Sequence, residues 1–243
     1  MSPSGSTVVV LFGLLAAYCD AATMRGGAIR TLQAKSDVPC SQAVRYKVVN
    51  DCQWNAERQP TDYPSNAHWS PLCGTTHDSE ASLYTLGGTA TDGVKLVAET
   101  GDCSILEEEV AFCSEGGNCG AFLKFPCDPF SGTCISEGMV DVSEAMPYLS
   151  MISMVAPSPD WIVGVDSFGL CKDGVWVAEY EKDLFPLDAG TDGGETFASD
   201  DVPLAERVPI VMLVAEEESN EFYNPMSNMI YPLCKISMTL QTS

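Results

Sequence analysis

Basic side chains are scarce in this chain, and their scarcity limits the partners it can have. Lys and Arg together number 12 against 34 Asp and Glu, which gives a formal net charge of −22 over 243 residues. A field of this sign repels the phosphates of nucleic acids and the surface of anionic membranes. It attracts cations and basic protein surfaces instead, so we expect no nucleic acid partner and no membrane insertion.

Histidine is almost absent, which narrows the catalytic mechanisms open to the chain. The only two, His68 and His77, lie in the segment HWSPLCGTTH, where Ser70 or Thr76 are the available nucleophiles. No G-x-S-x-G elbow surrounds them, and the chain contains no P-loop, GxGxxG or HExxH motif. We therefore predict that the protein is not an enzyme and that His77 packs or hydrogen-bonds at the start of a following helix. A secreted hydrolase remains the alternative.

Long apolar runs are also missing after the N-terminus. The stretch Val8 to Ala17 is apolar and precedes small residues, which predicts a signal peptide over residues 1–22. The stretch is short for a bilayer span, and no later segment is long and apolar enough to form one. Residues 23–36 are small, polar and basic and predict a flexible leader, followed by one domain over residues 37–243. We therefore expect a secreted protein of the extracellular space.

Cysteine, in contrast, is abundant. The chain has 11, and the loss of Cys19 with the signal peptide would leave 11 − 1 = 10. An even count in a secreted chain favours disulfides, whereas a zinc site needs closer pairs than Cys113 with Cys119 or Cys127 with Cys134. Five bridges are expected, with connectivity left open. The cysteine-rich stretch 103–134 has little apolar content, so its bridges are expected to close local loops.

Strand patterns dominate the C-terminal half. Apolar or alternating runs separated by turn residues follow Cys134, and one more lies near Val48. These runs favour an antiparallel β-sandwich with helices in one long connection. They are Ala43–Val49, Leu149–Ala156, Trp161–Asp166, Val175–Glu181, Val208–Ala215 and Leu233–Gln241.

The long connection carries three helix signals. Asp78 and Ser79 can cap a helix that starts near Glu80. The stretch Thr91–Thr100 places apolar side chains on one face, and Ile105–Phe112 predicts a further short helix.

Two acidic motifs carry the chemistry of this chain. Asp160 lies in PSPDW, and Asp188 and Asp192 lie in the glycine-bearing run DAGTDGG. Their oxygens are hard donors of the kind Ca²⁺ selects, and the absence of His and Cys from both motifs makes zinc or copper a poor match. Three carboxylates are too few for Ca²⁺ alone, so backbone carbonyls or water must complete the shell. Asp-Gly clusters also form ordinary solvated turns, which is the alternative interpretation.

These motifs carry a family resemblance. PSPDW, GVDSFGLC and DLFPLDAGTDGG, with HWSPLCGTTHDSEASLY and YKVVNDCQW upstream, closely resemble the spondin domain of F-spondin and mindin. The resemblance extends over roughly residues 38–242. It implies a mainly β, C2-like antiparallel β-sandwich with a divalent-cation site whose ligands match Asp160, Asp188 and Asp192. It also implies a disulfide between Cys40 and Cys171.

The chain differs from the family pattern in two respects. Family members usually continue into thrombospondin type 1 repeats, and no such repeat follows in this sequence. Mindin-like domains also lack a cysteine-rich stretch like the one at 103–134. These differences bear on specific partners rather than on the fold.

The resemblance implies a Ca²⁺-binding protein of the extracellular matrix that acts in cell adhesion or surface recognition. Its partners would be an extracellular protein or a cell or microbial surface, with integrin-like receptors among the possibilities. A purely structural matrix component, in which cation and disulfides serve stability only, is the alternative. We further expect Trp161 to pack beneath the metal loops and orient them.

Overall fold

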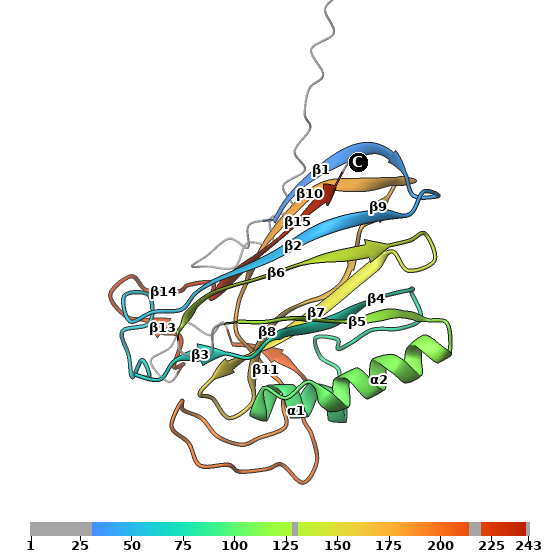
Figure 1. The fold of residues 1–243 in the computed structure, drawn as a ribbon. Helices are drawn as coiled ribbons and strands as arrows, with labels where there is room; N and C mark the ends of the chain where they lie inside the picture. The colour runs from blue at the N-terminus through green and yellow to red at the C-terminus, as the bar shows by residue number, and fades with distance from the viewer. Residues whose placement is uncertain (1–30, 128–130, 214–219, 242–243) are drawn as a thin grey trace, which may run out of the picture.

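The computed structural model describes residues 31–127, 131–213 and 220–241, which form two facing antiparallel sheets with two short helices (Figure 1). This arrangement confirms the predicted mainly β sandwich with helices in a long connection. The predicted signal peptide, residues 1–22, lies outside the described residues.

The first sheet has the strand order β1-β10-β15-β2-β6, and β9 pairs with β10. Its central strands alternate buried and exposed positions, so one face of each lies in the core and the other faces solvent. The strands are β1 (Thr31–Pro39), β2 (Val44–Gln53), β6 (Thr133–Val142), β9 (Cys171–Lys172), β10 (Val175–Leu184) and β15 (Cys234–Gln241).

The second sheet has the order β12-β11-β8-β7-β4-β5, and β3 pairs with β7. Strand β7 is buried at nearly every position because it is covered on both faces, by the first sheet and by a helix. The strands are β3 (His68–Trp69), β4 (Leu72–His77), β5 (Cys119–Phe125), β7 (Tyr148–Ala156), β8 (Trp161–Gly169), β11 (Leu187–Asp188) and β12 (Val211–Met212). A separate hairpin joins β13 (Tyr223–Asn224) to β14 (Met229–Ile230).

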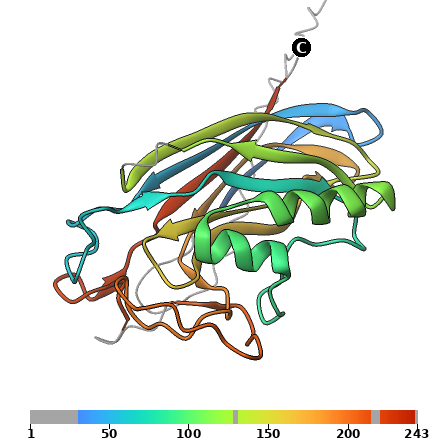
Figure 2. The ribbon, with the colours of Figure 1, turned by 60° about the horizontal axis from the view of Figure 1, so that its bottom comes forward.

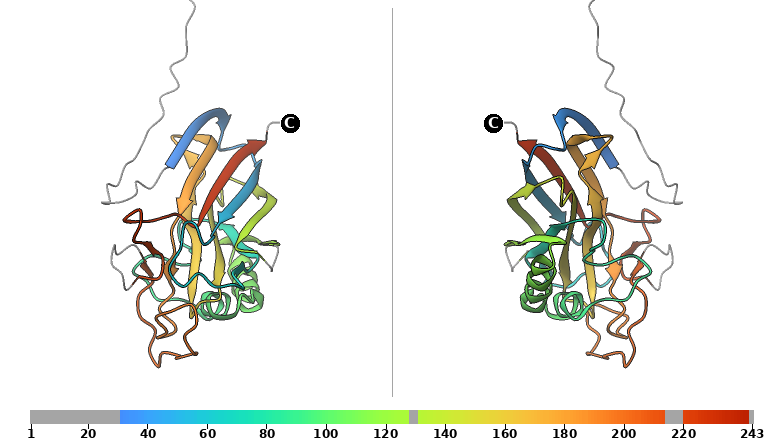
Figure 3. Two further views of the ribbon diagram at one scale, coloured as in Figure 1. Left: turned by 90° about the vertical axis from the view of Figure 1, so that its left-hand side faces the viewer. Right: turned by 90° about the vertical axis from the view of Figure 1, so that its right-hand side faces the viewer.

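The helices α1 (Asp92–Thr100) and α2 (Ser104–Glu115) lie on the outer face of the second sheet (Figures 2 and 3). Thr91 caps α1 by accepting the Val94 N–H, and Gly101 ends the helix at a φ of 73°. The buried face of α1 includes Val94 and Val97, as the periodicity predicts. No helix in the described residues is long and apolar enough to cross a membrane.

The predicted helix near Glu80 is wrong. Asp78 Oδ1 does accept the N–H groups of Glu80 and Ala81, at 2.9 and 3.1 Å, so the capping contacts form. No helix follows these contacts, because the segment forms backbone hydrogen bonds with a distant part of the chain instead. The Gly87 N–H donates to the Ile210 carbonyl, and the Ile210 N–H donates to Gly88.

The leader prediction for residues 23–36 is also wrong where the structure describes it. From Thr31 onward the chain is strand β1, which pairs with β10, and the Ser36 hydroxyl donates to the Trp176 carbonyl at 2.6 Å. A strand at the edge of a sheet tolerates polar side chains, which explains why the sequence looked like a leader. The strand predicted at Val208–Ala215 is shorter in the described residues, where it comprises only β12.

Five disulfides join all ten cysteines of the described residues, as expected. One joins Cys40 to Cys171, the pair that the resemblance implies. The expectation of purely local bridges within 103–134 is wrong for Cys103, which bonds Cys73 on β4 because α1 and α2 pack on that sheet. The other local bridges, Cys113–Cys119 and Cys127–Cys134, do close short loops.

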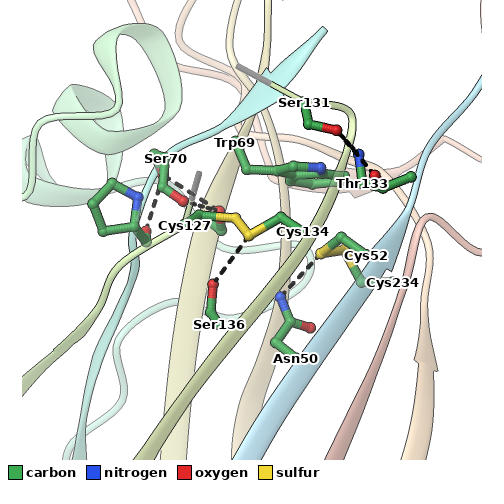
Figure 4. Close-up of a disulfide and its surroundings, with 12 residues drawn as sticks. Asn50, Cys52, Trp69, Ser70, Cys127, Ser131, Thr133, Cys134, Ser136 and Cys234 are labelled. Atoms are coloured by element: carbon green, nitrogen blue, oxygen red, sulfur yellow. Dashed lines mark hydrogen bonds between the residues drawn. A yellow bond between two sulfur atoms is a disulfide. The ribbon is translucent and has the colours of Figure 1, made fainter. Parts of the chain in front are cut away.

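Two disulfides lie side by side at one end of the sandwich (Figure 4). Cys52 on β2 is in register with Cys234 on one side, to which it is bonded, and with Cys134 on the other. Cys134 bonds Cys127, which follows β5, so this bridge ties the first sheet to the second. The Asn50 amide lies beside the pair and donates to Cys52 Sγ at 3.2 Å (Figure 4).

The close approach of β4 and β7 yields a prediction about Gly74. A Cβ at this position would lie 2.0 Å from the Ser150 carbonyl oxygen, a backbone atom that cannot move aside. We expect Gly74→Ala to lower the free energy of unfolding by about 1–3 kcal/mol, measured by urea denaturation. The matched control is Gly169→Ala, whose Cβ would meet only the Tyr148 ring, at 3.2 Å. An equal loss in both variants would contradict the assignment of the effect to strand spacing.

Candidate metal centre

Asp160 occupies the turn before β8, and its side chain is fully buried. Its Oδ2 accepts the Thr191 N–H at 2.6 Å, the Thr191 hydroxyl at 3.2 Å and the Asp192 N–H at 3.1 Å. These bonds cross 31 residues of sequence and hold the DAGTDGG loop against the PSPDW turn. The structure therefore brings the two motifs together, as the sequence predicts.

Asp188 and Asp192 line the second loop. Asp188 lies in β11, opposite Trp161 of β8, and its Oδ1 accepts the Gly190 N–H at 2.7 Å. The Oδ1 of Asp192 accepts the Gly194 N–H at 2.7 Å, and its Oδ2 accepts the Val202 N–H, also at 2.7 Å. Each carboxylate thus accepts a hydrogen bond from a backbone N–H group of its own loop, and Asp192 accepts a second one from Val202 in the segment that follows the loop.

Gly190 is required at the bend of this loop. Its φ is 70°, a left-handed conformation that glycine adopts without strain. A Cβ there would also lie 2.2 Å from the Val208 carbonyl oxygen. The glycine lets the segment that contains Val208 pack directly against the acidic loop.

The electrostatics of the cluster reflect its burial. The pKa of Asp160 is raised to about 6, chiefly by burial and also by the charge of Asp188, against the opposing effect of the hydrogen bonds from Thr191 and Asp192. Burial also raises the pKa of Asp188, and the charge of Asp192 adds to this effect. Neighbouring carboxylates in such surroundings favour a proton or a cation among them.

Some of the carboxylate oxygens are open to a cation. Asp160 Oδ1 is buried and has no hydrogen-bond partner, and the second oxygen of Asp188 accepts no hydrogen bond within the described part of the chain. In residues 31–127, 131–213 and 220–241, no group of three His, Cys, Asp or Glu side chains is arranged so that it could hold a metal ion without rearrangement. The donor chemistry and the orphaned oxygen fit a hard cation, and the metal site of Asp160, Asp188 and Asp192 stays a prediction.

Thr191 is a part of this site that the motif analysis did not identify. It is fully buried, and both its N–H and its hydroxyl donate to Asp160. The sequence signal was its position between the two acids of DAGTD, but a threonine in a turn is too common to be distinctive.

Aromatic rings pack behind the acidic loops. The Trp161 ring contacts Phe197, which follows the second motif, at a centroid distance of 5.2 Å, and Phe222 at 5.0 Å. Trp161 is 4% exposed. Trp161 therefore packs next to Asp160 and against the strand that contains Asp188, as predicted.

His77 lies far from these acids and has an unforeseen partner. Its Nε2 lies 2.8 Å from Ser150 Oγ and its Nδ1 lies 2.8 Å from the Asp78 carbonyl oxygen, while Ser70 contacts Ser153 instead. His77 is 1% exposed and Ser150 is 0% exposed. A substrate cannot reach this pair, so its role is to satisfy buried polar groups.

Sequence comparisons place these features in a known context. The Spondin_N family matches residues 44–232, a span that contains all three acids. Spondin-2 of Rattus norvegicus is 31% identical over 200 residues, which cover 79% of this chain and 60% of that protein. Spondin-2 of Homo sapiens is 29% identical, with 88% and 66% covered, and Spondin-1 of Mus musculus is 32% identical, with 85% and 27% covered. The matched part of the chain thus spans 60% to 66% of these Spondin-2 proteins and 27% of that Spondin-1.

The burial of Asp160 predicts a pH dependence of stability in buffer without divalent cations. A carboxyl whose pKa rises on folding stabilises the fold below its unfolded pKa of 3.8, and this contribution is lost as the pH rises through the folded value of about 6. We expect the wild type to gain about 2 kcal/mol relative to Asp160→Asn as the pH falls from about 7 to about 4. Urea unfolding of both proteins across this range measures the difference. Parallel stability curves would show that Asp160 titrates normally.

Proposed function

Because the chain belongs to the Spondin_N family, we propose that it is a secreted, calcium-binding spondin-domain protein that acts in the extracellular matrix by adhesion or surface recognition. Five disulfides support secretion, since such bonds persist in oxidising compartments and are rare in the cytosol. The predicted signal peptide agrees with this.

The observation that carries the proposal is the buried, unpartnered Oδ1 of Asp160. An orphaned carboxylate oxygen in the protein interior is destabilising unless a cation or a proton meets it. Ca²⁺ takes six to eight oxygen ligands, and its site here would use Asp160, Asp188 and Asp192 together with backbone carbonyls or water. When bound, the ion would supply positive charge that offsets the repulsion among the three acids.

The chain's own residues prepare a rigid surface around this position. The segment after the acidic loop is bound to it by three backbone hydrogen bonds: Val202 accepts from Gly193, Leu204 donates to Thr191, and Val208 donates to Gly190. A cation would stiffen a loop that is already held at several points. Recognition surfaces gain affinity when their ordering is complete before a partner arrives.

The partners we propose are an extracellular protein or a cell or microbial surface, with integrin-like receptors among the candidates. The net charge of −22 supports attraction to basic protein surfaces and opposes direct contact with anionic lipid. A structural matrix component is the second candidate, favoured by the number of disulfides alone. Binding measurements separate the two.

Calcium should stabilise the wild-type fold. At about 100 times the dissociation constant, a bound ion adds about 2.7 kcal/mol, which raises the melting temperature by about 5–10 °C in a chain of this size. Asp188→Asn should lose most of this rise. Asp201→Asn, an exposed acid near the same loop, is the matched control and should keep it. Differential scanning calorimetry in Ca²⁺ and in EDTA makes the comparison, and identical melting temperatures of the wild type in both would refute the site.

Adhesion should depend on the same ion. We expect labelled full-length protein to bind cultured cells or decellularised matrix saturably in Ca²⁺. We expect EDTA or Asp188→Asn to remove the binding, because the ion no longer offsets the repulsion among the acids or stiffens the loop that presents the surface. Asp201→Asn should bind as the wild type does. Calcium stabilisation without any saturable binding would favour the structural role instead.

A further inference from the structure

A groove of about 950 Å³ opens between the two sheets at the end of the sandwich opposite the acidic loops. Thr76 in its wall pairs with Leu149 at the start of β7, whereas the acidic turn lies beyond the end of β7. The groove is therefore separate from the candidate metal centre. It follows β6 and β5, the edge strands of the two sheets, which lie on the same side of the molecule (Figure 1).

The groove begins where the two edge strands stop touching. Phe125 of β5 lies directly over Gly138 of β6, so closely that a Cβ at 138 would meet the ring at 2.1 Å. This contact closes the sandwich, and beyond it the walls of the groove are mainly aliphatic. They include Val38, Val44, Leu123, Met139, Val142 and Met146.

Among the described residues of the wall, Thr76 is the one buried polar residue. Thr76 is 5% exposed, and its hydroxyl makes no hydrogen bond to any residue that the structure describes. Gly120 keeps the space in front of it open, because a Cβ at 120 would lie 2.3 Å from Thr76 Oγ1. The hydroxyl itself is not enclosed by protein and can be reached from the groove, so a ligand with a hydrogen-bonding group can bond to it.

The charges in the groove cancel. Among the described residues of its wall only Arg45 and Asp141 are charged, and they form a bidentate ion pair at 2.6 and 2.9 Å. A cationic ligand would find no free carboxylate here, and an anionic ligand would be opposed by the net charge of −22. The groove thus complements an uncharged molecule.

We propose that this groove binds an uncharged amphiphile with a single aliphatic chain and a hydroxyl or carbonyl group that bonds to Thr76. Its volume and its mainly apolar wall with a few polar side chains, Thr76 among them, are typical of a small-molecule site. The apolar wall provides affinity, and the Thr76 hydroxyl fixes the orientation of the ligand.

Three probes with the same ten-carbon chain test the proposal: 1-decanol, decanoate and decylammonium. Titration of the full-length protein, followed by amide NMR shifts, should give saturable changes at Thr76, Gly120 and Ala121 with decanol. The two charged probes should bind more weakly, because neither finds a free counter-ion. Thr76→Val should weaken decanol binding about 2- to 10-fold, the effect of one neutral hydrogen bond.

Two tryptophan variants on β5 provide the steric test. Ala121 is exposed and lies in the groove wall, so Ala121→Trp should fill the groove and abolish binding without disturbing the core. Lys124→Trp changes an exposed residue of the same strand outside the wall and should leave the affinity unchanged. EDTA should not alter decanol binding, so the result is independent of the calcium site.

Several outcomes would overturn the proposal. These are an absence of saturable shifts up to the solubility limit of decanol, equal affinity for all three probes, or equal loss in both tryptophan variants. A dimer seen by sedimentation and dissociated by Ala121→Trp would identify a second copy of the chain as the occupant instead.

Discussion

The acidic end of this sandwich depends on a cluster of aromatic rings packed between the sheets behind the loops. Trp54 lies at its centre, with centroid distances of 5.3 Å to Phe197 and 6.0 Å to Trp69. Phe197 and Phe222 also contact each other, at 5.2 Å. Because these rings come from segments far apart in the sequence, each segment is fixed in place by the others. Ring pairs of this kind each contribute about 0.5–1.5 kcal/mol beyond the burial of their area.

That cluster explains how a buried carboxylate can be maintained next to it. Asp160 precedes Trp161, so the ring that anchors the turn also sets the direction of the carboxylate. The cost of desolvating Asp160 is partly offset by three hydrogen bonds from Thr191 and Asp192. The loop presents these donors because its own end is anchored by Phe197. Packing and polar bonding at this end therefore depend on each other.

Much of the fold could be predicted from the sequence because local patterns and tertiary packing agree over long stretches. The strand runs around Val48, Leu149 and Trp161 have alternating or continuous apolar residues, and each forms the expected strand. The segment after Asp78 shows where this fails: its capping contacts are local and form, but its course is set by pairing with Ile210, which lies far along the chain.

In the candidate site, too, local motifs could be predicted from the sequence and long-range contacts could not. Motif spacing drew attention to Asp160, Asp188 and Asp192, the resemblance implied that they form one ligand set, and the structure brings their two loops together. The partner of His77 was not predictable, since Ser150 lies 73 residues away and becomes its neighbour only through the pairing of β4 with β7. The Cys73–Cys103 disulfide was likewise not predictable, because it depends on where the two helices pack on the sheet. The spacing of cysteines in the sequence does not reveal this.

The order β1-β10-β15 determines how the domain would bear a mechanical load. Strands β1 and β15 are both antiparallel to β10, so they run in the same direction, and Thr31 lies at the opposite end of the sheet from Gln241. A tension applied between these two residues acts along the strands and loads the hydrogen bonds between them together, in shear, instead of opening them one after another. The Cys40–Cys171 disulfide, directly after β1, then prevents the chain beyond β1 from being pulled away from the sheet. Under such a tension the first sheet extends only after many of these hydrogen bonds have broken together.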